Sequence, residues 1–227
     1  DLSYIHPNKD FLFQNITFTI PAGEKCAIVG NNGVGKSTLL RILAGKIPPA
    51  TGTIVCDDIL YMIPQHFGQF DGMSVAEALG LADKLRALSI ILDGRGTEKE
   101  YEQLNDEWDI PERLTEAFAK WQIGHIAPDM LMGNLSGGEK TRVFLAGQDI
   151  FKPSIVLMDE PTNHLDTTGR ALVYEDIAHT NRTTVIVSHD RTLLNRLSAI
   201  YEMSPTGMQF LSLIHISEPT RPLYISY

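Results

Sequence analysis

Cysteine is scarce in this chain, with 2 residues in a length of 227. So few thiols exclude a disulfide-stapled scaffold as the source of stability. Cys26 and Cys56 both lie in apolar runs typical of strands, so we favour small buried hydrophobic side chains over a disulfide or a metal pair. This pattern suits a reducing, cytoplasmic setting.

Long apolar runs and dense clusters of Lys or Arg are also missing. No run approaches the roughly 20 residues that a membrane span needs, so a partner would have to supply any contact with a membrane. The net charge of −9 argues against a nucleic-acid-binding surface spread over the domain. A length of 227 residues suits one large domain, with or without an inserted subdomain, but not two complete domains of that size.

The stretch from Gly30 to Thr38 fits G-x-x-x-x-G-K-[ST], the phosphate-binding loop. Its glycines let backbone N–H groups converge on phosphate oxygens, while Lys36 reaches the outer phosphates and the Ser37 hydroxyl ligates Mg²⁺. Residues 25–29 are typical of a buried strand and residues 37–44 of a helix, as the motif requires. The nucleotide-binding residues predicted here are Gly30, Asn31, Asn32, Gly33, Val34, Gly35, Lys36, Ser37 and Thr38.

Polar side chains follow two later apolar strands. The strand at 155–158 ends in Asp159 and Glu160, and the strand at 183–187 is followed by His189. Ligands of open α/β folds bind at the carboxyl edge of a parallel sheet, so we expect these groups at one site. Asp159 is predicted to hold Mg²⁺ through water, Glu160 to orient the attacking water, and His189 to donate a hydrogen bond to the γ-phosphate. A lone histidine is more often structural, so the inference depends on the whole set.

Two further candidates carry little weight alone. Gln65 follows a short expected strand at 59–62, where it can meet a γ-phosphate or its Mg²⁺. Tyr4 either stacks on an adenine ring or packs in the core. Alternating apolar residues over 11–20 predict an antiparallel strand, and 52–56 is expected to form another.

The composition shifts toward helix between residues 67 and 134. Apolar residues recur at helical spacing over 75–92 and 98–121, with a turn at 93–97. We interpret this segment as an inserted helical subdomain with a short protruding hairpin. Trp108 and Trp121 are expected to be core anchors within it.

The sequence LSGGE at 135–139 opens a helix that we expect to run to about Phe151. Ser136 with Glu139 three residues later is a capping box, which is a purely structural explanation. The same helix N-terminus, with Gly137 and Gly138, is also an anion site, because its free N–H groups and dipole favour phosphate. Both interpretations can hold together.

Together these motifs resemble the nucleotide-binding domain of ATP-binding cassette (ABC) proteins over residues 2–210. The resemblance rests on the phosphate loop, Gln65 of the Q-loop, the LSGGE signature, the Asp159-Glu160 pair, Asp166 of the D-loop and His189 of the switch loop. It implies an α/β fold, with a P-loop NTPase (RecA-like) parallel sheet core, an antiparallel β subdomain and an inserted helical subdomain.

The resemblance also implies ATP and Mg²⁺ as cofactors and ATP hydrolysis as the activity. ATP would lie between the phosphate loop of one domain and the signature of a second, which belongs either to the same full-length chain or to a homodimer. Ser136, Gly137 and Gly138, with Asp166, would thus bind nucleotide held by that partner. The implied metal-binding set is Ser37, Gln65 and Asp159.

Within the family, the run EPTNHLD at 160–166 is similar to the ABC-F subfamily, whose members are soluble proteins acting on ribosomes. LSGGEKTRV at 135–143 agrees with it, although Glu139 stands where Gln is commoner. The resemblance implies a role in translation or antibiotic protection, with ribosome, rRNA and tRNA contacted through a linker and arm. Two alternatives stay open: the ATP-binding subunit of an ABC membrane transporter, and a nucleotide-binding fragment that is inactive without a partner domain.

The expected ABC domain occupies residues 1–210, with the β subdomain and RecA-like core in 1–66 and 135–210 and the helical subdomain in 67–134. Residues 211–227 resemble a translated sequencing-library adapter, so we expect an artefactual tail there. The chain opens without Met and inside a strand-like region, and no linker or second domain follows Phe210. The run Trp108-Asp109-Ile110, followed by a helix, looks like the first of the two ABC-F domains, so we expect that domain here, with the linker and the second domain in sequence that is not given.

Overall fold

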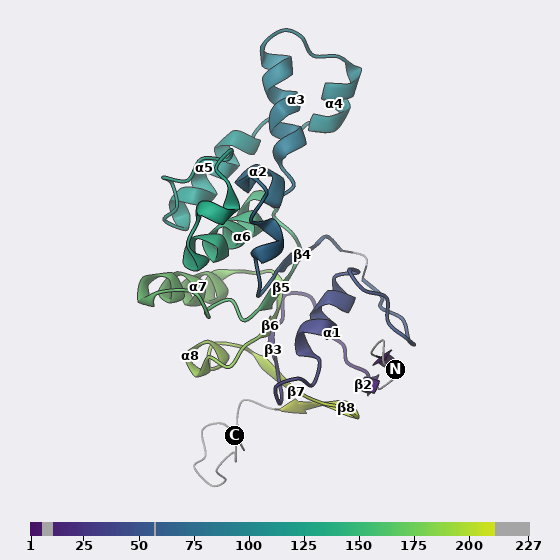
Figure 1. Cartoon of the computed structure of the whole chain (residues 1–227). Helices are drawn as coiled ribbons and strands as arrows, with labels where there is room; N and C mark the ends of the chain where they lie inside the picture. The colour runs from purple at the N-terminus through teal and green to yellow at the C-terminus, as the bar shows by residue number, and fades with distance from the viewer. Residues whose placement is uncertain (6–10, 57, 212–227) are drawn as a thin grey trace. The chain divides into compact units, whose positions relative to one another are not determined.

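The computed structural model describes residues 1–5, 11–56 and 58–211 (Figure 1). The chain forms two compact units. The first comprises Asp1–Met62, Ser154–Glu160 and the chain from Asp176 onward, and the second comprises Ile63–Pro153 and Pro161–Glu175. The domain limits expected from the sequence stay a prediction, and the expected artefactual tail, apart from Leu211, lies outside the described residues.

A six-stranded sheet in the order β4-β5-β6-β3-β7-β8 forms the core of the first unit. Its strands are β3 (Lys25–Val29), β4 (Leu60–Ile63), β5 (Ile155–Asp159), β6 (Thr183–Val187), β7 (Ala199–Ser204) and β8 (Gly207–Leu211). β3 runs parallel to β6 and β7, β5 runs parallel to β6, and β8 is antiparallel to β7. The register pairs Asp159 with Val187 and Val187 with Ile28, so β3, β5 and β6 end at the same edge. The predicted α/β fold with a parallel core is confirmed.

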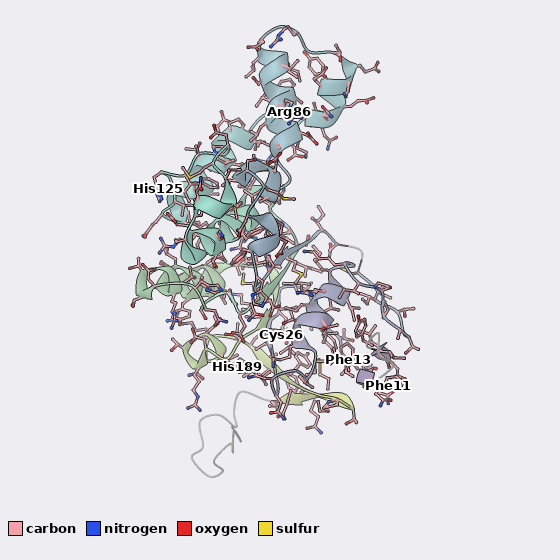
Figure 2. The ribbon with its side chains drawn as sticks, in the orientation of Figure 1. Phe11, Phe13, Cys26, Arg86, His125 and His189 are labelled. Atoms are coloured by element: carbon pink, nitrogen blue, oxygen red, sulfur yellow. The ribbon has the colours of Figure 1, made fainter. Side chains whose placement is uncertain are left out.

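Helix α1 (Lys36–Leu43) packs on this sheet through Leu39 and Leu40, which are buried among side chains of β3 and β5. Gly35 precedes the helix at φ +102°, and a Cβ there would lie 2.8 Å from Phe13 Cδ1. Only glycine combines this backbone conformation with that space. Cys26 on β3 is fully buried, as predicted, and Figure 2 labels it with Phe13.

A two-stranded antiparallel sheet joins β1 (Leu2–Ile5) to β2 (Phe11–Ile16). The strand expected over 11–20 ends at Ile16, and Asn15, one residue before that end, takes a left-handed φ of 57°. The strand expected over 52–56 does not form. Gly52, at φ +95°, lies against the Asp1 backbone, and Cys56 beyond it is exposed, so its prediction as a buried side chain was wrong.

Helices make up the second unit. They are η1 (Gly68–Phe70), α2 (Val75–Ala78), α3 (Ala82–Leu92), α4 (Glu98–Leu104), α5 (Ile110–Lys120), η2 (Met132–Asn134) and α6 (Gly137–Phe151). Gly80, at φ +73°, divides the single helix expected over 75–92 into α2 and α3. Helices α3 and α4 pack against each other as a hairpin around the predicted turn, and α5 packs on α6.

The two tryptophans of this unit differ. Trp121 is 1% exposed and its Nε1 donates to Asp149 Oδ2 at 2.8 Å, so it is the core anchor that the sequence predicted. Trp108 is 45% exposed beside Tyr101, with ring centroids 6.0 Å apart, and its prediction as a core residue was wrong.

Helix α7 (Thr167–His179) begins in the second unit and ends in the first, which also holds α8 (Arg191–Leu194). Over residues 1–5, 11–56 and 58–211, no helix has both the length and the apolar character needed to cross a bilayer.

Candidate nucleotide site

The predicted phosphate loop connects β3 to the N-terminus of α1 in the first unit. Its first residue, Gly30, has a φ of +150°, and a Cβ there would collide with the Met203 carbonyl oxygen. Val34 is buried and packs in the core, so it can offer only its backbone to a ligand. The loop thus combines a glycine backbone conformation at Gly30 with a buried apolar side chain at Val34 that fixes the loop to the core.

Lys36 folds back over this loop. Its ammonium donates to the carbonyl oxygens of Gly30 at 2.8 Å and Asn31 at 2.9 Å. Burial lowers the pKa of Lys36, and the nearby carboxylates of Glu160 and Asp159 oppose that shift. The ammonium is therefore held at the mouth of the loop, close to two negative groups.

Ser37 and Asp159 form the group that a metal ion could use. Ser37 Oγ donates to Asp159 Oδ1 at 3.1 Å, and Asp159 is 3% exposed at the end of β5. A hydroxyl and a carboxylate are the hard oxygen donors that Mg²⁺ prefers. Across the described part of the chain no cluster of three or more His, Cys, Asp or Glu could hold a metal by itself. That fits Mg²⁺, which takes one or two protein ligands together with phosphates and water.

Glu160, the next residue, has an unusual backbone. Its φ is 49°, and its N–H donates to Val187 O at 2.8 Å, which ties the end of β5 to that of β6. Its carboxylate faces His189 in two ways. The ring Nε2 of His189 lies 3.5 Å from Glu160 Oε1, and the backbone N–H of His189 donates to Glu160 Oε2 at 3.4 Å. Burial raises the pKa of Glu160, with His189 opposing the shift. A carboxylate whose pKa is raised is a stronger base than an exposed one.

The structure therefore brings together Lys36, Ser37, Asp159, Glu160 and His189 in the first unit, from strands and a helix far apart in the sequence. Figure 2 labels His189 among the side chains of this unit. Tyr4 stacks on Phe13 at 6.2 Å between ring centroids, which is a packing contact, and its contact with adenine stays a prediction. Gln65 belongs to the second unit, and its role at the phosphates stays a prediction as well.

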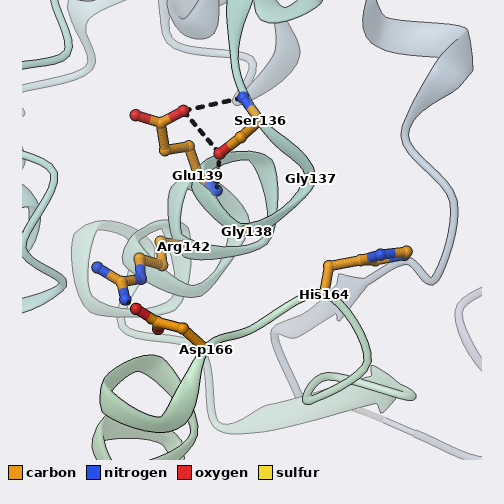
Figure 3. A pocket seen from close by; sticks show the side chains of 7 residues that line it. All are labelled: Ser136, Gly137, Gly138, Glu139, Arg142, His164 and Asp166. Atoms are coloured by element: carbon orange, nitrogen blue, oxygen red, sulfur yellow. Dashed lines mark hydrogen bonds and ion pairs between the residues drawn. The ribbon is translucent and has the colours of Figure 1, made fainter.

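A pocket of about 570 Å³ lies in the second unit at the N-terminus of α6 (Figure 3). It is lined by Ser136, Gly137, Gly138, Glu139, Arg142, His164 and Asp166. The predicted capping box is present: Glu139 N donates to Ser136 Oγ at 3.3 Å, and Ser136 N donates to Glu139 Oε2 at 2.8 Å. The helix also has the predicted length.

Asp166 lies across this pocket at the start of α7. Its Oδ1 accepts from Gly169 N at 2.8 Å and from Arg142 Nη2 at 2.7 Å. Both hydrogen bonds lower the pKa of Asp166, and the bond from the Gly169 N–H has the larger effect. Sequence reasoning missed Arg142 and His164. The sequence does indicate Arg142, because it lies three residues after Glu139 and therefore on the same face of the helix. His164 lies within the EPTNHLD run, but the sequence alone assigns it no role.

A phosphate loop between a strand and a helix, with a pair of carboxylates at the end of another strand of the same parallel sheet, defines a P-loop nucleotide-binding domain. The sequence model of the family described as "ABC transporter" matches residues 13–163. The chain belongs to this family, whose ATPase domains bind ATP with Mg²⁺.

The relatives point in two directions. The tylosin resistance ATP-binding protein TlrC of Streptomyces fradiae is 31% identical, over 87% of this chain and 40% of its own length. The ABC transporter F family member 4 of Arabidopsis thaliana is 32% identical, over 90% of this chain and 26% of its own length. The energy-coupling factor transporter ATP-binding protein EcfA1 of Geobacillus kaustophilus is 31% identical, over 83% of this chain and 68% of its own length. The chain thus spans less than half of the length of the first two relatives.

A solved structure supports the fold. The dimeric post-hydrolysis state of an ATP-binding cassette, bound to ADP and Pi, matches with a TM-score of 0.71 and 22% identity, covering 93% of this chain and 96% of that chain. At this identity the match supports the fold alone.

Proposed function

We propose that this chain is the ATP-hydrolysing nucleotide-binding domain of an ABC-F-type protein that acts on the ribosome in translation or in antibiotic protection. The observation that carries the ATPase proposal is the arrangement of Lys36, Ser37, Asp159, Glu160 and His189 within the first unit. The EPTNHLD run and the names of two relatives support the ABC-F assignment.

Each residue of the phosphate loop has a separate task in this proposal. The backbone N–H groups of residues 30–38 bind phosphate oxygens, and Lys36 leaves the carbonyls of Gly30 and Asn31 to bind the outer phosphates. Ser37 and Asp159 would hold Mg²⁺, which when bound neutralises charge on the phosphates.

Hydrolysis depends on Glu160 and His189. Glu160 accepts a proton from the water whose oxygen attacks the γ-phosphorus, and the bond to the bridging oxygen of ADP breaks. His189 then donates a hydrogen bond to a γ-phosphate oxygen. The raised pKa of Glu160 and its 9% exposed side chain suit it to this role.

The pocket of the second unit completes the site of a partner domain in this proposal. Ser136 and the N–H groups of Gly137 and Gly138 would bind the γ-phosphate of nucleotide seated on that partner, with Asp166 beside them. The partner is a second ABC nucleotide-binding domain, from the same full-length protein or from another copy. Closure of the pair on ATP and release after hydrolysis would drive its action.

The substitution Glu160→Gln tests the hydrolytic role. It removes the base but keeps the shape, so ATP binding should stay within about twofold while turnover falls by about 100-fold or more. Glu116→Gln, which changes an exposed carboxylate on α5, is the matched control and should leave both unchanged. Turnover that survives Glu160→Gln would reject the role of Glu160.

Protein concentration distinguishes a self-assembling ATPase from a binding fragment. If two copies supply the composite site, ATPase activity rises faster than linearly with concentration. ATP binding without turnover at any concentration would favour a fragment that is inactive without its partner domain.

The transporter alternative has one specific observation in its favour, because the chain spans 68% of EcfA1. Cosedimentation of the Glu160→Gln variant with purified ribosomes separates the two assignments. An ABC-F protein should sediment with ribosomes only when ATP is present. Absence of that ATP dependence, together with binding to membrane-spanning transporter subunits, would replace our proposal by the transporter.

A further inference from the structure

Two aromatic side chains of the second unit, Tyr101 on α4 and Trp108 just before α5, lie together in solvent. Their ring centroids are 6.0 Å apart at an interplanar angle of 60°, and the residues are 51% and 45% exposed. Single exposed aromatic residues are ordinary, but two adjacent rings that are each about half exposed can be touched by one ligand group. We call Tyr101 and Trp108 together the aromatic surface.

The other tryptophan of the chain shows what such a ring can bind. Lys120 Nζ lies 5.3 Å from the centroid of the Trp121 ring, which is within the range of a cation–π contact. Over residues 1–5, 11–56 and 58–211, no cation lies above the ring of Tyr101 or Trp108 in this way. The aromatic surface can therefore accept a cation from outside the chain.

The segment that carries the aromatic surface is acidic. Residues 82–109, which include the α3–α4 hairpin (Figure 1), hold eight Asp or Glu and four Lys or Arg, so they contribute −4 to the net charge of −9. Three of the four cations, among them Arg86 (Figure 2), already pair with carboxylates of the same segment: Lys84 with Glu107, Arg86 with Asp83 and Arg95 with Asp93. Such a segment repels phosphates and attracts Lys and Arg side chains.

Some carboxylates close to the aromatic surface in the chain are not used internally. Glu98, Glu102 and Asp106 are exposed, and none of them has an ion pair or a side-chain hydrogen bond within the described part of the chain. Glu98 lies one helical turn before Tyr101 and Glu102 on α4, so these three side chains are neighbours on the helix surface. Two carboxylates thus flank one of the two rings.

We propose that the aromatic surface, together with Glu98 and Glu102, binds a segment of a partner protein that is rich in Arg and Lys. A guanidinium of that segment stacks on the rings while a neighbouring cation meets the carboxylates of α4. Arg is favoured over Lys, because its planar group stacks on an aromatic face. RNA is disfavoured: its bases can stack on aromatic rings, but its phosphates would meet an acidic helix. The inference does not rest on the proposed function, since it requires neither nucleotide nor a second ATP-binding domain.

NMR of the full chain locates the binding. The chain has 2 tryptophans, so its indole N–H signals distinguish the exposed Trp108 from the buried Trp121. The probe is a short peptide of alternating Arg and Gly. It should shift the Trp108 signal and leave the Trp121 signal in place. A Trp108 signal that does not respond to the peptide would overturn the inference.

Fluorescence anisotropy of the labelled peptide gives the affinity of each variant. Trp108→Leu keeps an apolar side chain but removes the ring, so binding should weaken by about threefold to fivefold, as for one exposed cation–π contact. Glu98→Gln combined with Glu102→Gln should weaken binding by about threefold. The matched control, Glu116→Gln combined with Asp129→Asn, removes the same charge from exposed sites of the second unit and should leave the affinity unchanged.

The variants separate a specific site from general attraction. A cationic peptide drawn only by the net charge of −9 would lose the same affinity in both double variants, which would refute the proposed site. Unchanged affinity in Trp108→Leu would refute the role of the aromatic surface.

Two further ligands test the chemistry of the partner. The corresponding peptide of Lys and Gly should bind more weakly than the Arg peptide, because it lacks the planar group. A single-stranded RNA of similar length should leave the Trp108 signal in place. If RNA shifts this signal at lower concentration than the Arg peptide does, the surface binds RNA and the proposed protein partner is wrong.

Discussion

Gly137 and Gly138 offer a matched pair of substitutions, because they are neighbours in the first turn of α6 but meet different surroundings. A Cβ added at Gly137 would lie 3.5 Å from the nearest side-chain atoms of His164, which is an ordinary contact. A Cβ added at Gly138 would lie 2.9 Å from the backbone oxygen of His164, which cannot move without its chain. Neither glycine has a positive φ, so backbone strain does not enter.

The magnitudes follow from these distances. Replacing glycine by alanine at a compatible site stabilises a protein by about 0.4–1 kcal/mol, so Gly137→Ala should stabilise the second unit by about 0.5 kcal/mol. Gly138→Ala gains the same amount but adds an overpacked contact that costs about 1–3 kcal/mol. The two variants should therefore differ by about 2 kcal/mol in the free energy of unfolding.

Urea unfolding followed by tryptophan fluorescence measures this difference, because both tryptophans of the chain, Trp108 and Trp121, lie in the second unit. A Gly138→Ala variant as stable as Gly137→Ala would refute the reasoning, since it would mean that His164 retreats at no cost. Gly137→Ala also separates folding from the binding of a partner's nucleotide that we propose for this pocket. A variant that is more stable than the original chain but binds this nucleotide less well would show that the ligand, and not the fold, requires glycine at position 137.

Two further predictions concern the same unit. Trp121→Ala should cost about 3–5 kcal/mol in urea unfolding, because it empties a fully buried site, whereas Trp108→Ala should cost under about 1 kcal/mol; similar losses would contradict the packing described here. Hydrogen bonds from His125 and then Ser136 lower the pKa of Glu139 to about 2, so its contribution to stability is complete above the pKa near 4.3 of an unfolded glutamate and is lost as the pH falls toward 2. After allowance for solvent screening this contribution is about 1 kcal/mol. The free energy of unfolding should therefore fall less from pH 5 to pH 3 in Glu139→Gln than in the original chain, and an equally steep fall in both would contradict the prediction.

Much of the site could be predicted because its chemistry is written in short, contiguous motifs. The phosphate loop fixes both a backbone path and the residues that follow it, and a carboxylate directly after an apolar strand marks the carboxyl edge of the sheet. The helix beginning at Ser136 was located for the same reason, since Ser136 and Glu139 signal a helix start within four positions.

The errors arose where burial depends on contacts distant in sequence. Trp108 and Trp121 have the same intrinsic preference, but only Trp121 faces α6 and finds a partner for its indole N–H in Asp149. Cys56 lies in an apolar run that has the composition of a strand, yet Gly52 takes a left-handed conformation before it. His125 was invisible for a related reason: only the fold brings it to Glu139.

The backbone of Glu160 connects the local structure to the chemistry in a way that its residue type does not reveal. A non-glycine residue at φ 49° is strained by about 1–2 kcal/mol, and it persists only where its surroundings hold it. Here the Val187 carbonyl accepts the Glu160 N–H, and the His189 N–H holds its carboxylate. Because this left-handed residue directly follows β5, the direction of the chain changes after Asp159. Two successive carboxylates can then take different environments, one at Ser37 and one at His189. A regular strand would instead point them to opposite faces of the sheet, so in the function proposed above the strain at Glu160 is what would let adjacent residues serve metal binding and proton transfer together.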